Sequence, residues 1–269
     1  MRFLQGRTAI ITGGGRGIGR AVARAYSEAG AAVVITARTR REVEETVRDI
    51  VARGASALAM PGDVSDEDTP GRVVQAALDT YGRLDILVNA AGINGPVAAV
   101  EDIAPAEWER VFRINVSGTF LFCRAAIPLM RRQKSGSILN VASGLVRRVQ
   151  PGQAAYSAAK AAIAHFSSVL AAELAEDAIR VNAIHPGIVK TRLLNELLSL
   201  DPSGVTGKVV GRLRSVEQAG QLTTLEQSSR LFLMMVSPVA ADLSGRFIAA
   251  EDAAIAEHMK RFTETYGKA

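Results

Sequence analysis

Short runs of β-branched residues alternate with helical patterns along most of this 269-residue chain. The strand-like runs are continuously apolar, as in AVVITA at 32–37, which is typical of strands that helices cover on both faces. The alternation predicts an α/β fold with a doubly wound parallel sheet and right-handed crossovers. We expect strands at 8–12, 32–37, 55–60, 84–89, 137–142 and 180–185, and helices at 18–29, 40–53, 66–81, 105–132, 153–174, 224–236 and 253–266.

No low-complexity linker interrupts this alternation, so we expect a single domain over residues 1–269. Residues 192–222 do not continue the alternation of strand and helix patterns. They hold a short helical pattern at 193–200 and a loop pattern at 201–207, and we expect them to form a lid over the substrate. The segment 253–266 predicts a C-terminal helical extension.

Cysteine and histidine give no sign of a metal site. The single cysteine, Cys123, lies in an apolar run and is expected to be a buried thiol. His165, His185 and His258 show no metal-ligand spacing, so we expect no metal. No apolar run approaches the ~18 residues of a membrane span and no signal-peptide pattern is present, so a cytoplasmic protein without membrane contact is expected.

Positive charge is concentrated near the N-terminus. The net charge is +5, but residues 1–41 hold eight arginines against one glutamate. Such a segment is typical of a protein that binds nucleic acid, a membrane surface or a phosphorylated ligand. The chain has neither an aromatic stacking platform nor a basic groove-binding helix, so we favour a phosphorylated ligand over nucleic acid.

The sequence TGGGRGIG at 12–19 lies between the first expected strand and the first expected helix. Glycines permit a tight turn and close approach of the backbone to a pyrophosphate, and a helix N-terminus attracts that anion. The loop therefore predicts a dinucleotide site that includes Gly13, Arg16, Gly17 and Ile18.

The end of the second strand indicates which dinucleotide is bound. An acidic residue usually binds the adenosine 2′-hydroxyl at this point, but here Ala37 is followed by Arg38. A guanidinium can bind a 2′-phosphate that a carboxylate would repel. With Arg16 nearby, NADP(H) is favoured and NAD(H) is the alternative; Arg40 and Arg41 fit a solvated turn.

Tyr156 and Lys160 are four residues apart in an alanine-rich helical segment, so they share one helical face. An ammonium beside a phenol lowers the phenol's pKa from about 10 and makes it a usable proton donor and acceptor. Such a pair is frequent by chance on solvated helices. Ser143, thirteen residues earlier and just past a strand, strengthens the interpretation.

Several motifs stand in order along the chain: TGGGRGIG at 12–19, GDV at 62–64, NAAG at 89–92, Asn115, Ser143, YSAAK at 156–160 and PGIVKT at 186–191. Together they resemble the motifs of the short-chain dehydrogenase/reductase family, and in particular its NADP(H)-dependent 3-oxoacyl reductase-like members. The resemblance covers residues 5–191 closely and extends more loosely to residue 250. It implies a Rossmann fold and an enzyme that transfers a hydride between NADP(H) and a carbonyl or secondary alcohol.

The resemblance also assigns roles to residues. Tyr156 is the implied general acid/base, Lys160 holds the nicotinamide ribose and lowers the pKa of Tyr156, Ser143 binds the reacting oxygen and Asn115 holds a water of the proton relay. The implied cofactor contacts are Asp63 and Val64 at the adenine, Asn89, Ala90 and Gly92 along the ribose, and Pro186, Gly187, Val189 and Thr191 near the nicotinamide.

Several alternatives stay open. The expected partner is a small carbonyl or alcohol substrate, or an acyl-CoA, ahead of an acyl carrier protein: Lys134 suits the carrier, but Asp177 stands where such relatives often have arginine. Arg147 and Arg148 either contact an anionic substrate or are solvated. The runner-up functions are an NAD-dependent secondary-alcohol dehydrogenase and a non-catalytic dinucleotide-binding regulator.

The expected assembly is a homodimer or homotetramer that packs through the helices at 105–132 and 153–174. The segment 244–252 departs from the VDGG-like sequence with which the family often closes its last strand. That departure weakens the transfer of the family's usual tetramer interface.

Overall fold

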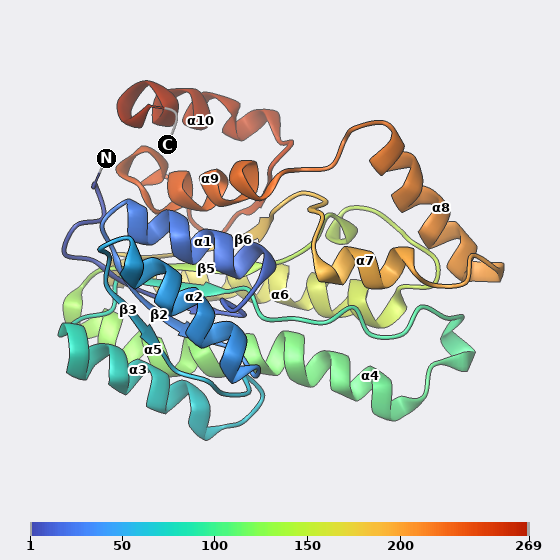
Figure 1. Ribbon diagram of the computed structural model, residues 1–269, viewed down its shortest axis with the longest axis horizontal. Coiled ribbons are helices and arrows are strands. Elements are labelled where there is room, and N and C mark those ends of the chain that lie inside the picture. The colour runs from blue at the N-terminus through green and yellow to red at the C-terminus, as the bar shows by residue number, and fades with distance from the viewer. Residues whose placement is uncertain (1, 268–269) are drawn as a thin grey trace.

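The computed structural model describes residues 2–267, and a seven-stranded parallel sheet lies at its centre (Figure 1). The strand order is β3-β2-β1-β4-β5-β6-β7. This confirms the predicted doubly wound α/β fold. The strands are β1 (Thr8–Thr12), β2 (Ala32–Thr36), β3 (Ala57–Ala59), β4 (Ile86–Asn89), β5 (Gly136–Val141), β6 (Ile179–His185) and β7 (Phe247–Ala249).

Helices cover both faces of the sheet, as the continuously apolar strands require. One face is covered by α1 (Gly17–Glu28), α2 (Arg40–Ala52) and α9 (Leu225–Val236), with α10 (Ala253–Tyr266) packed outside α9. The other face is covered by α3 (Asp68–Tyr81), α5 (Gly118–Gln133) and α6 (Ala154–Glu173). Beyond the carboxyl ends of the strands lie α4 (Pro105–Phe112), α7 (Arg192–Leu198) and α8 (Gly204–Gln218).

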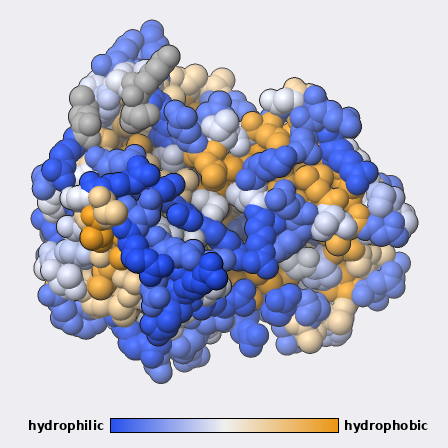
Figure 2. Space-filling view, in the orientation of Figure 1, coloured by the Kyte–Doolittle hydropathy of each residue, from blue (hydrophilic) through white to orange (hydrophobic). Residues whose placement is uncertain are grey.

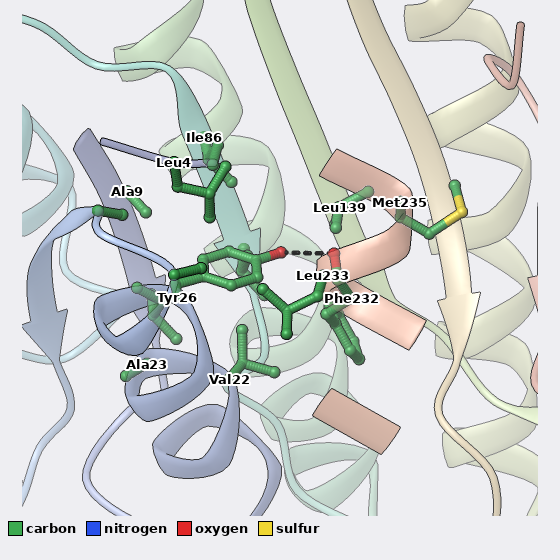
Figure 3. Close-up of a cluster of buried hydrophobic side chains, with 14 of the residues drawn as sticks. Leu4, Ala9, Val22, Ala23, Tyr26, Ile86, Leu139, Phe232, Leu233 and Met235 are labelled. Atoms are coloured by element: carbon green, nitrogen blue, oxygen red, sulfur yellow. Dashed lines mark hydrogen bonds between the residues drawn. The ribbon is translucent and has the colours of Figure 1, made fainter. Parts of the chain in front are cut away.

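Side chains alternate across a sheet, so neighbouring residues of a strand pack into the hydrophobic cores on opposite faces. Ile11 packs among α1 and α9, whereas Ile10 packs among α3 and α5. Figure 3 shows the first of these cores, where the Tyr26 hydroxyl of α1 donates to the carbonyl oxygen of Phe232 in α9 at 3.0 Å. The two helices are thereby held together near the amino end of β1, at the end of α1 away from the glycine loop.

Two expected elements differ from the structure. The expected helix 105–132 is interrupted by a π-helical turn at Arg113–Ser117 that separates α4 from α5. The expected loop 201–207 is partly helical, because α8 begins at Gly204. Hydrophobic periodicity could not reveal either feature: a wide turn keeps nearly the same apolar face, and the Ser-Gly start of α8 carries a loop-like composition.

Most of the N-terminal arginines have acidic partners from later in the chain. Arg7 pairs with Asp85, Arg24 with Asp49, and the remaining pairs are Arg16–Glu42, Arg40–Glu44 and Arg41–Glu45. In the view of Figure 2, hydrophilic residues cover the side of α1 and α2, and apolar residues show in the hollow between that side and α7–α8. The local excess of arginine is thus largely balanced by ion pairs, two of them within α2 and three between more distant parts of the chain.

Cys123 is buried, as predicted, and burial raises the pKa of its thiol to about 12. Among residues 2–267 no group of three or more potential metal-ligating side chains comes together. Within the same residues no helix is long and apolar enough to span a membrane.

Candidate active site

The loops after β1 and β4 meet at the carboxyl edge of the sheet, where the strand order reverses. In doubly wound folds ligands bind at this point. Thr12, the last residue of β1, joins the two loops: its Oγ1 accepts hydrogen bonds from the backbone N–H groups of Ala90 and Ala91 at 3.0 and 3.1 Å.

Glycine is required in the first loop by close backbone contact. A Cβ on Gly13, which has a φ of +66°, would lie 2.9 Å from Ala91 Cα, and one on Gly19 would lie 2.4 Å from the Gly13 carbonyl oxygen. Only glycine allows the loop to turn this tightly into α1. The N-terminus of α1 is thereby left open to an anion.

A groove of about 170 Å³ runs along these loops and is named here the nucleotide groove. Thr191, which follows β6, closes one side of it: its Cγ2 would lie 3.4 Å from a Cβ on Gly17. Among the predicted cofactor residues, those that line the groove are Gly13, Arg16, Gly17, Ile18, Arg38, Asp63, Val64, Ala90, Gly92 and Thr191.

A second cavity of about 170 Å³ adjoins the nucleotide groove and is named the substrate cavity. Ile18, Ala90, Gly92 and Thr191 line both spaces. All four residues of the predicted catalytic set line the substrate cavity: Asn115, Ser143, Tyr156 and Lys160. The structure also places Pro186, Gly187 and Val189 there.

The Tyr156–Lys160 pair lies on the first turns of α6, as its spacing predicts. Lys160 is only 4% exposed, its Nζ donates to the Val141 carbonyl oxygen at 2.8 Å, and it lies 5.6 Å from the centre of the Tyr156 ring. Burial lowers the pKa of Lys160 to about 8, so the ammonium is still predominantly charged at neutral pH.

Burial has the larger effect on the Tyr156 phenol, and a lowering of its pKa by Lys160 stays a prediction. Burial raises the pKa of Tyr156 to about 12, and the opposing effect comes from a hydrogen bond with Ser143 rather than from Lys160. The phenol is therefore held in its neutral form. That form suits a proton donor more than a resting phenolate.

Ser143 lies just past β5, and its hydroxyl also accepts from the Leu145 N–H at 3.3 Å, capping a short turn. The hydroxyl thus has a fixed place beside the Tyr156 phenol. Two oxygen donors at one end of the substrate cavity can share the oxygen atom of a bound carbonyl.

Asn115 is fully buried at the π-helical turn. Its side chain donates to the carbonyl oxygens of Ile93 and Val111 and accepts from the Ile93 N–H at 3.1 Å. The side chain positions the loop after β4. Its role in holding a water stays a prediction.

The structure does not bring the Asn89 side chain to the nucleotide groove. Its Nδ2 donates to Asn140 Oδ1 at 2.8 Å and to the Cys123 sulfur, so it connects β4 to β5 inside the core. Any contact of Asn89 with the ribose would come from its backbone, and that contact stays a prediction. Asp63 does reach the groove, where its Oδ1 accepts from both the N–H and the hydroxyl of Ser65.

Arg38 and Arg16 both line the nucleotide groove, but their surroundings differ. Arg16 lies 3.2 Å from Glu42, which also lines the groove. Arg38 is exposed and is in no salt bridge with residues 2–267. Arg38 is therefore the arginine more available to an incoming phosphate.

Sequence reasoning missed Glu42 at the groove, Arg212 of α8 at the substrate cavity, and the role of the Thr12 hydroxyl. Thr12 could have been inferred as the first residue of its motif. No local signal marks Glu42 or Arg212, because α2 and α8 look like ordinary charged helices. Only the packing of these helices over the strand ends brings the two residues to the site.

A larger cavity, of about 830 Å³, lies at the opposite end of the sheet. Its lining includes Arg7, Asp85 and Arg180. Asp85 is paired with Arg7 and Arg83, and Arg180 donates to the backbone carbonyl oxygens of Met235, Ala240 and Leu243. These charged groups are used in holding the fold together, so we do not place the active site there.

A glycine loop lies where the strand order reverses, beside a serine, a tyrosine and a lysine. This arrangement defines a dinucleotide-dependent oxidoreductase of alcohol and carbonyl groups. Residues 7–200 match the family described as short chain dehydrogenase. The chain belongs to that family, whose members bind a nicotinamide dinucleotide.

The chain is similar to several relatives in this family. It is 36% identical over 198 residues to a 3-oxoacyl-(acyl-carrier-protein) reductase from Synechocystis sp., covering 73% of this chain and 80% of the relative. It is 34% identical over 247 residues to cis-4-hydroxycyclohexanecarboxylate dehydrogenase from Sinomonas cyclohexanicum, covering 91% of this chain and 95% of that relative. A solved structure assigned as an NAD(P)-dependent gluconate 5-dehydrogenase from Beutenbergia cavernae, with NADP at low occupancy, superposes with a TM-score of 0.82 at 32% identity and covers 92% of this chain and 96% of that one.

Proposed function

We propose that this protein is an NADP(H)-dependent carbonyl reductase or secondary-alcohol dehydrogenase in which Tyr156 is the general acid/base. The observation that carries the proposal is the convergence of Ser143, Tyr156 and Lys160 on one cavity that adjoins the nucleotide groove. The site fits a dinucleotide for two reasons. Backbone atoms lie where side chains on Gly13 and Gly19 would be, and the buried Lys160 ammonium lies beside Gly92, which lines both spaces.

In the direction of reduction, a bound NADPH supplies the hydride. Tyr156 then gives its phenolic proton to the carbonyl oxygen, which Ser143 also binds. Lys160 lies between the phenol and Gly92, which lines both spaces, so its charge favours the phenolate left after proton transfer and can hold ribose hydroxyls. The reverse direction uses the same groups with the phenolate as base.

A small substrate fits the cavity better than a carrier protein. The volume of about 170 Å³ is below the ~300–1,000 Å³ typical of pockets for drug-sized ligands. Lys134, the expected contact for an acidic carrier, lies 3.6 Å from Asp177, which also binds Arg131 at 2.7 Å. The name of one relative, a hydroxycyclohexanecarboxylate dehydrogenase, supports a small cyclic secondary alcohol or ketone as substrate class.

The proposed assembly is a homodimer or homotetramer packed through the helices α5 and α6. Phe120 of α5 and Val169 of α6 are exposed, and Phe120 lies against Phe166 edge-on with ring centres 6.4 Å apart. An apolar surface shared by two long helices is typical of a subunit interface.

The proposal is tested with a panel of small cyclic ketones, aldoses, 3-oxoacyl thioesters and their alcohols, each assayed with NADPH and NADH by nicotinamide absorbance. We expect turnover of cyclic ketones with NADPH. Tight NADPH binding without turnover of any panel member, at any pH assayed, would favour the non-catalytic regulator instead.

Arg38→Asp is expected to reduce kcat/KM for NADPH by about 100-fold and to leave or improve that for NADH. The substitution removes the unpaired guanidinium at the adenosine end and adds a charge that repels a 2′-phosphate. Arg41→Asp is the matched control, because Arg41 is 86% exposed and paired with Glu45 outside the groove. An unchanged NADPH preference in Arg38→Asp would leave NAD(H) as the better assignment, consistent with Glu42 lying in the groove.

The pH dependence of cofactor use should follow Lys160. We expect kcat/KM for NADPH, measured at saturating ketone, to be level up to about pH 7.5 and to fall by up to about tenfold per pH unit above about pH 8. Lys160 loses its proton there, whereas Tyr156 with its pKa of about 12 keeps its own. A profile that stays level to about pH 10 would contradict a cofactor-binding ammonium at residue 160.

A further inference from the structure

The charged side chains around the substrate cavity are all basic. Arg148, Lys160 and Arg212 line it together with His185, and no Asp or Glu among residues 2–267 does so. Lys160 already has a role, since it donates to Val141 and lies beside Gly92, which lines both spaces: a Cβ on Gly92 would be 3.6 Å from its Nζ. The two arginines have no function in the chemistry derived above.

Arg148 differs from its neighbour Arg147. Arg147 binds Asp252, donates to the Phe247 carbonyl oxygen at 3.0 Å and lies over the Phe247 ring. Arg148 is in no salt bridge within the described part of the chain and lies against the residue after Ser143: a Cβ on Gly144 would be 3.5 Å from Arg148 Nη2. Its guanidinium is therefore beside the proposed reaction centre.

Arg212 reaches the same cavity from α8. It is partly buried among apolar residues of α7 and α8, and both burial and the nearby Arg148 charge lower the pKa of its guanidinium. Arg148 is exposed and Arg212 is partly buried. Two like charges close to one another are unfavourable unless an anion joins them.

The acidic residues nearby do not supply that anion. Asp252 is bound by Arg147. Glu251 lies 3.7 Å from His185 Nε2 and lines a neighbouring cavity, together with Arg148, but it does not line the substrate cavity.

We propose that Arg148 and Arg212 bind a carboxylate of the substrate, so that the enzyme acts on a small oxo or hydroxy carboxylic acid. The inference rests on the proposed function and adds the substrate class to it. Guanidinium forks match the two oxygens of a carboxylate. Leu145, Leu194, Leu197 and Leu213 also line the cavity and provide an apolar wall for the carbon frame between the carboxylate and the reacting carbon.

The two arginines come from different parts of the fold. Arg148 lies in the loop between β5 and α6, whereas Arg212 belongs to the segment 192–218, which leaves the core after Val189 and returns to it where the Thr223 N–H donates to the Ile188 carbonyl oxygen at 2.9 Å. A bound carboxylate would therefore hold α8 against the core over the reaction centre.

The test uses direct binding, so it does not depend on turnover. Cyclohexanecarboxylate and cyclohexanecarboxamide, which share a frame and differ in charge, are titrated calorimetrically into enzyme saturated with NADP⁺. We expect the wild type to bind the acid at least about tenfold more tightly than the amide. Arg148→Ala and Arg212→Ala should each lose most of this difference, and Arg212→Lys should retain part of it.

Arg214→Ala is the matched control, because Arg214 is an exposed arginine of the same helix that does not line the cavity. It should keep the wild-type ratio of acid to amide affinity. Equal affinity of the wild type for acid and amide, or no binding of either, would overturn the proposal. So would a tenfold preference for cyclohexyl phosphate, which would assign the arginines to a phosphate ester.

Ketone turnover in the substrate panel separates this proposal from the function on which it rests. Selective binding of the acid without turnover of any ketone would reject the proposed reaction and keep the anion site. Reduction of neutral ketones together with equal affinity for acid and amide would keep the proposed reaction and reject the anion site.

Discussion

Tyr156→Phe is expected to lower kcat by about 10³-fold while the dissociation constant for NADPH stays within about twofold. The phenolic hydroxyl is the only part removed, and the ring that lines the cavity stays in place. Because burial holds the phenol neutral, with a pKa of about 12, Tyr156 carries its proton at pH 7, and the phenylalanine variant has none to give from this position.

Tyr81→Phe is the matched control for this substitution. Tyr81 is also a partly buried tyrosine whose pKa burial raises, but it lies at the end of α3 away from both cavities. Its variant should turn over at the wild-type rate. NADPH affinity is measured by fluorescence titration and kcat by nicotinamide absorbance. A Tyr156→Phe enzyme that kept its rate would show that another group donates the proton.

Lys160→Met is expected to lower kcat/KM by about 10³-fold and to weaken NADPH binding by at least about tenfold, without loss of stability. Methionine keeps the length of the side chain and removes the charge. The free energy of unfolding at pH 7 should rise by about 1–2 kcal/mol, because a buried ammonium whose pKa has fallen from 10.5 to about 8 costs stability while it is charged. The loss of the hydrogen bond to Val141 offsets part of that gain.

The sign of the stability effect can be checked against pH. Since the folded-state pKa lies below the unfolded value, the wild type should gain stability as the pH rises from about 8 to 10.5, and the advantage of Lys160→Met should shrink over the same range. Urea unfolding at several pH values measures this. Lys260→Met, at an exposed position of α10, should change neither activity nor stability appreciably. A Lys160→Met protein that was much less stable than the wild type would instead indicate a structural lysine.

Two large parts of this protein were predictable because they depend on residues near one another in the chain. The alternation of apolar runs and helical patterns predicted the parallel sheet, and six of its seven strands were expected within a few residues. TGGGRGIG predicted a loop that only glycine can form, and the contacts of Gly13 and Gly19 supply the reason. The spacing of Tyr156 and Lys160 placed both on one helical face.

Other features depend on elements that meet only after the chain crosses over the sheet. Asn89 belongs to a motif associated with the cofactor, yet its side chain bonds to Asn140 of the adjacent strand. The sequence indicates Arg16 as a second phosphate ligand, whereas in the fold Glu42 of α2 lies 3.2 Å from it. The pKa of Tyr156 was predicted from the charge four residues away, but the burial created by the surrounding loops has the larger effect.

The sequence by itself determined the fold class, the position of the nucleotide loop and the presence of a proton-transfer pair, because helix and strand periodicities and glycine conformations are local properties. Only the tertiary structure decided which charges face the reacting centre. It set Arg147 against Asp252, left Arg148 in the substrate cavity and brought Arg212 to it from α8. Burial and charge pairing arise between segments distant in sequence, so the properties that select a substrate follow from packing.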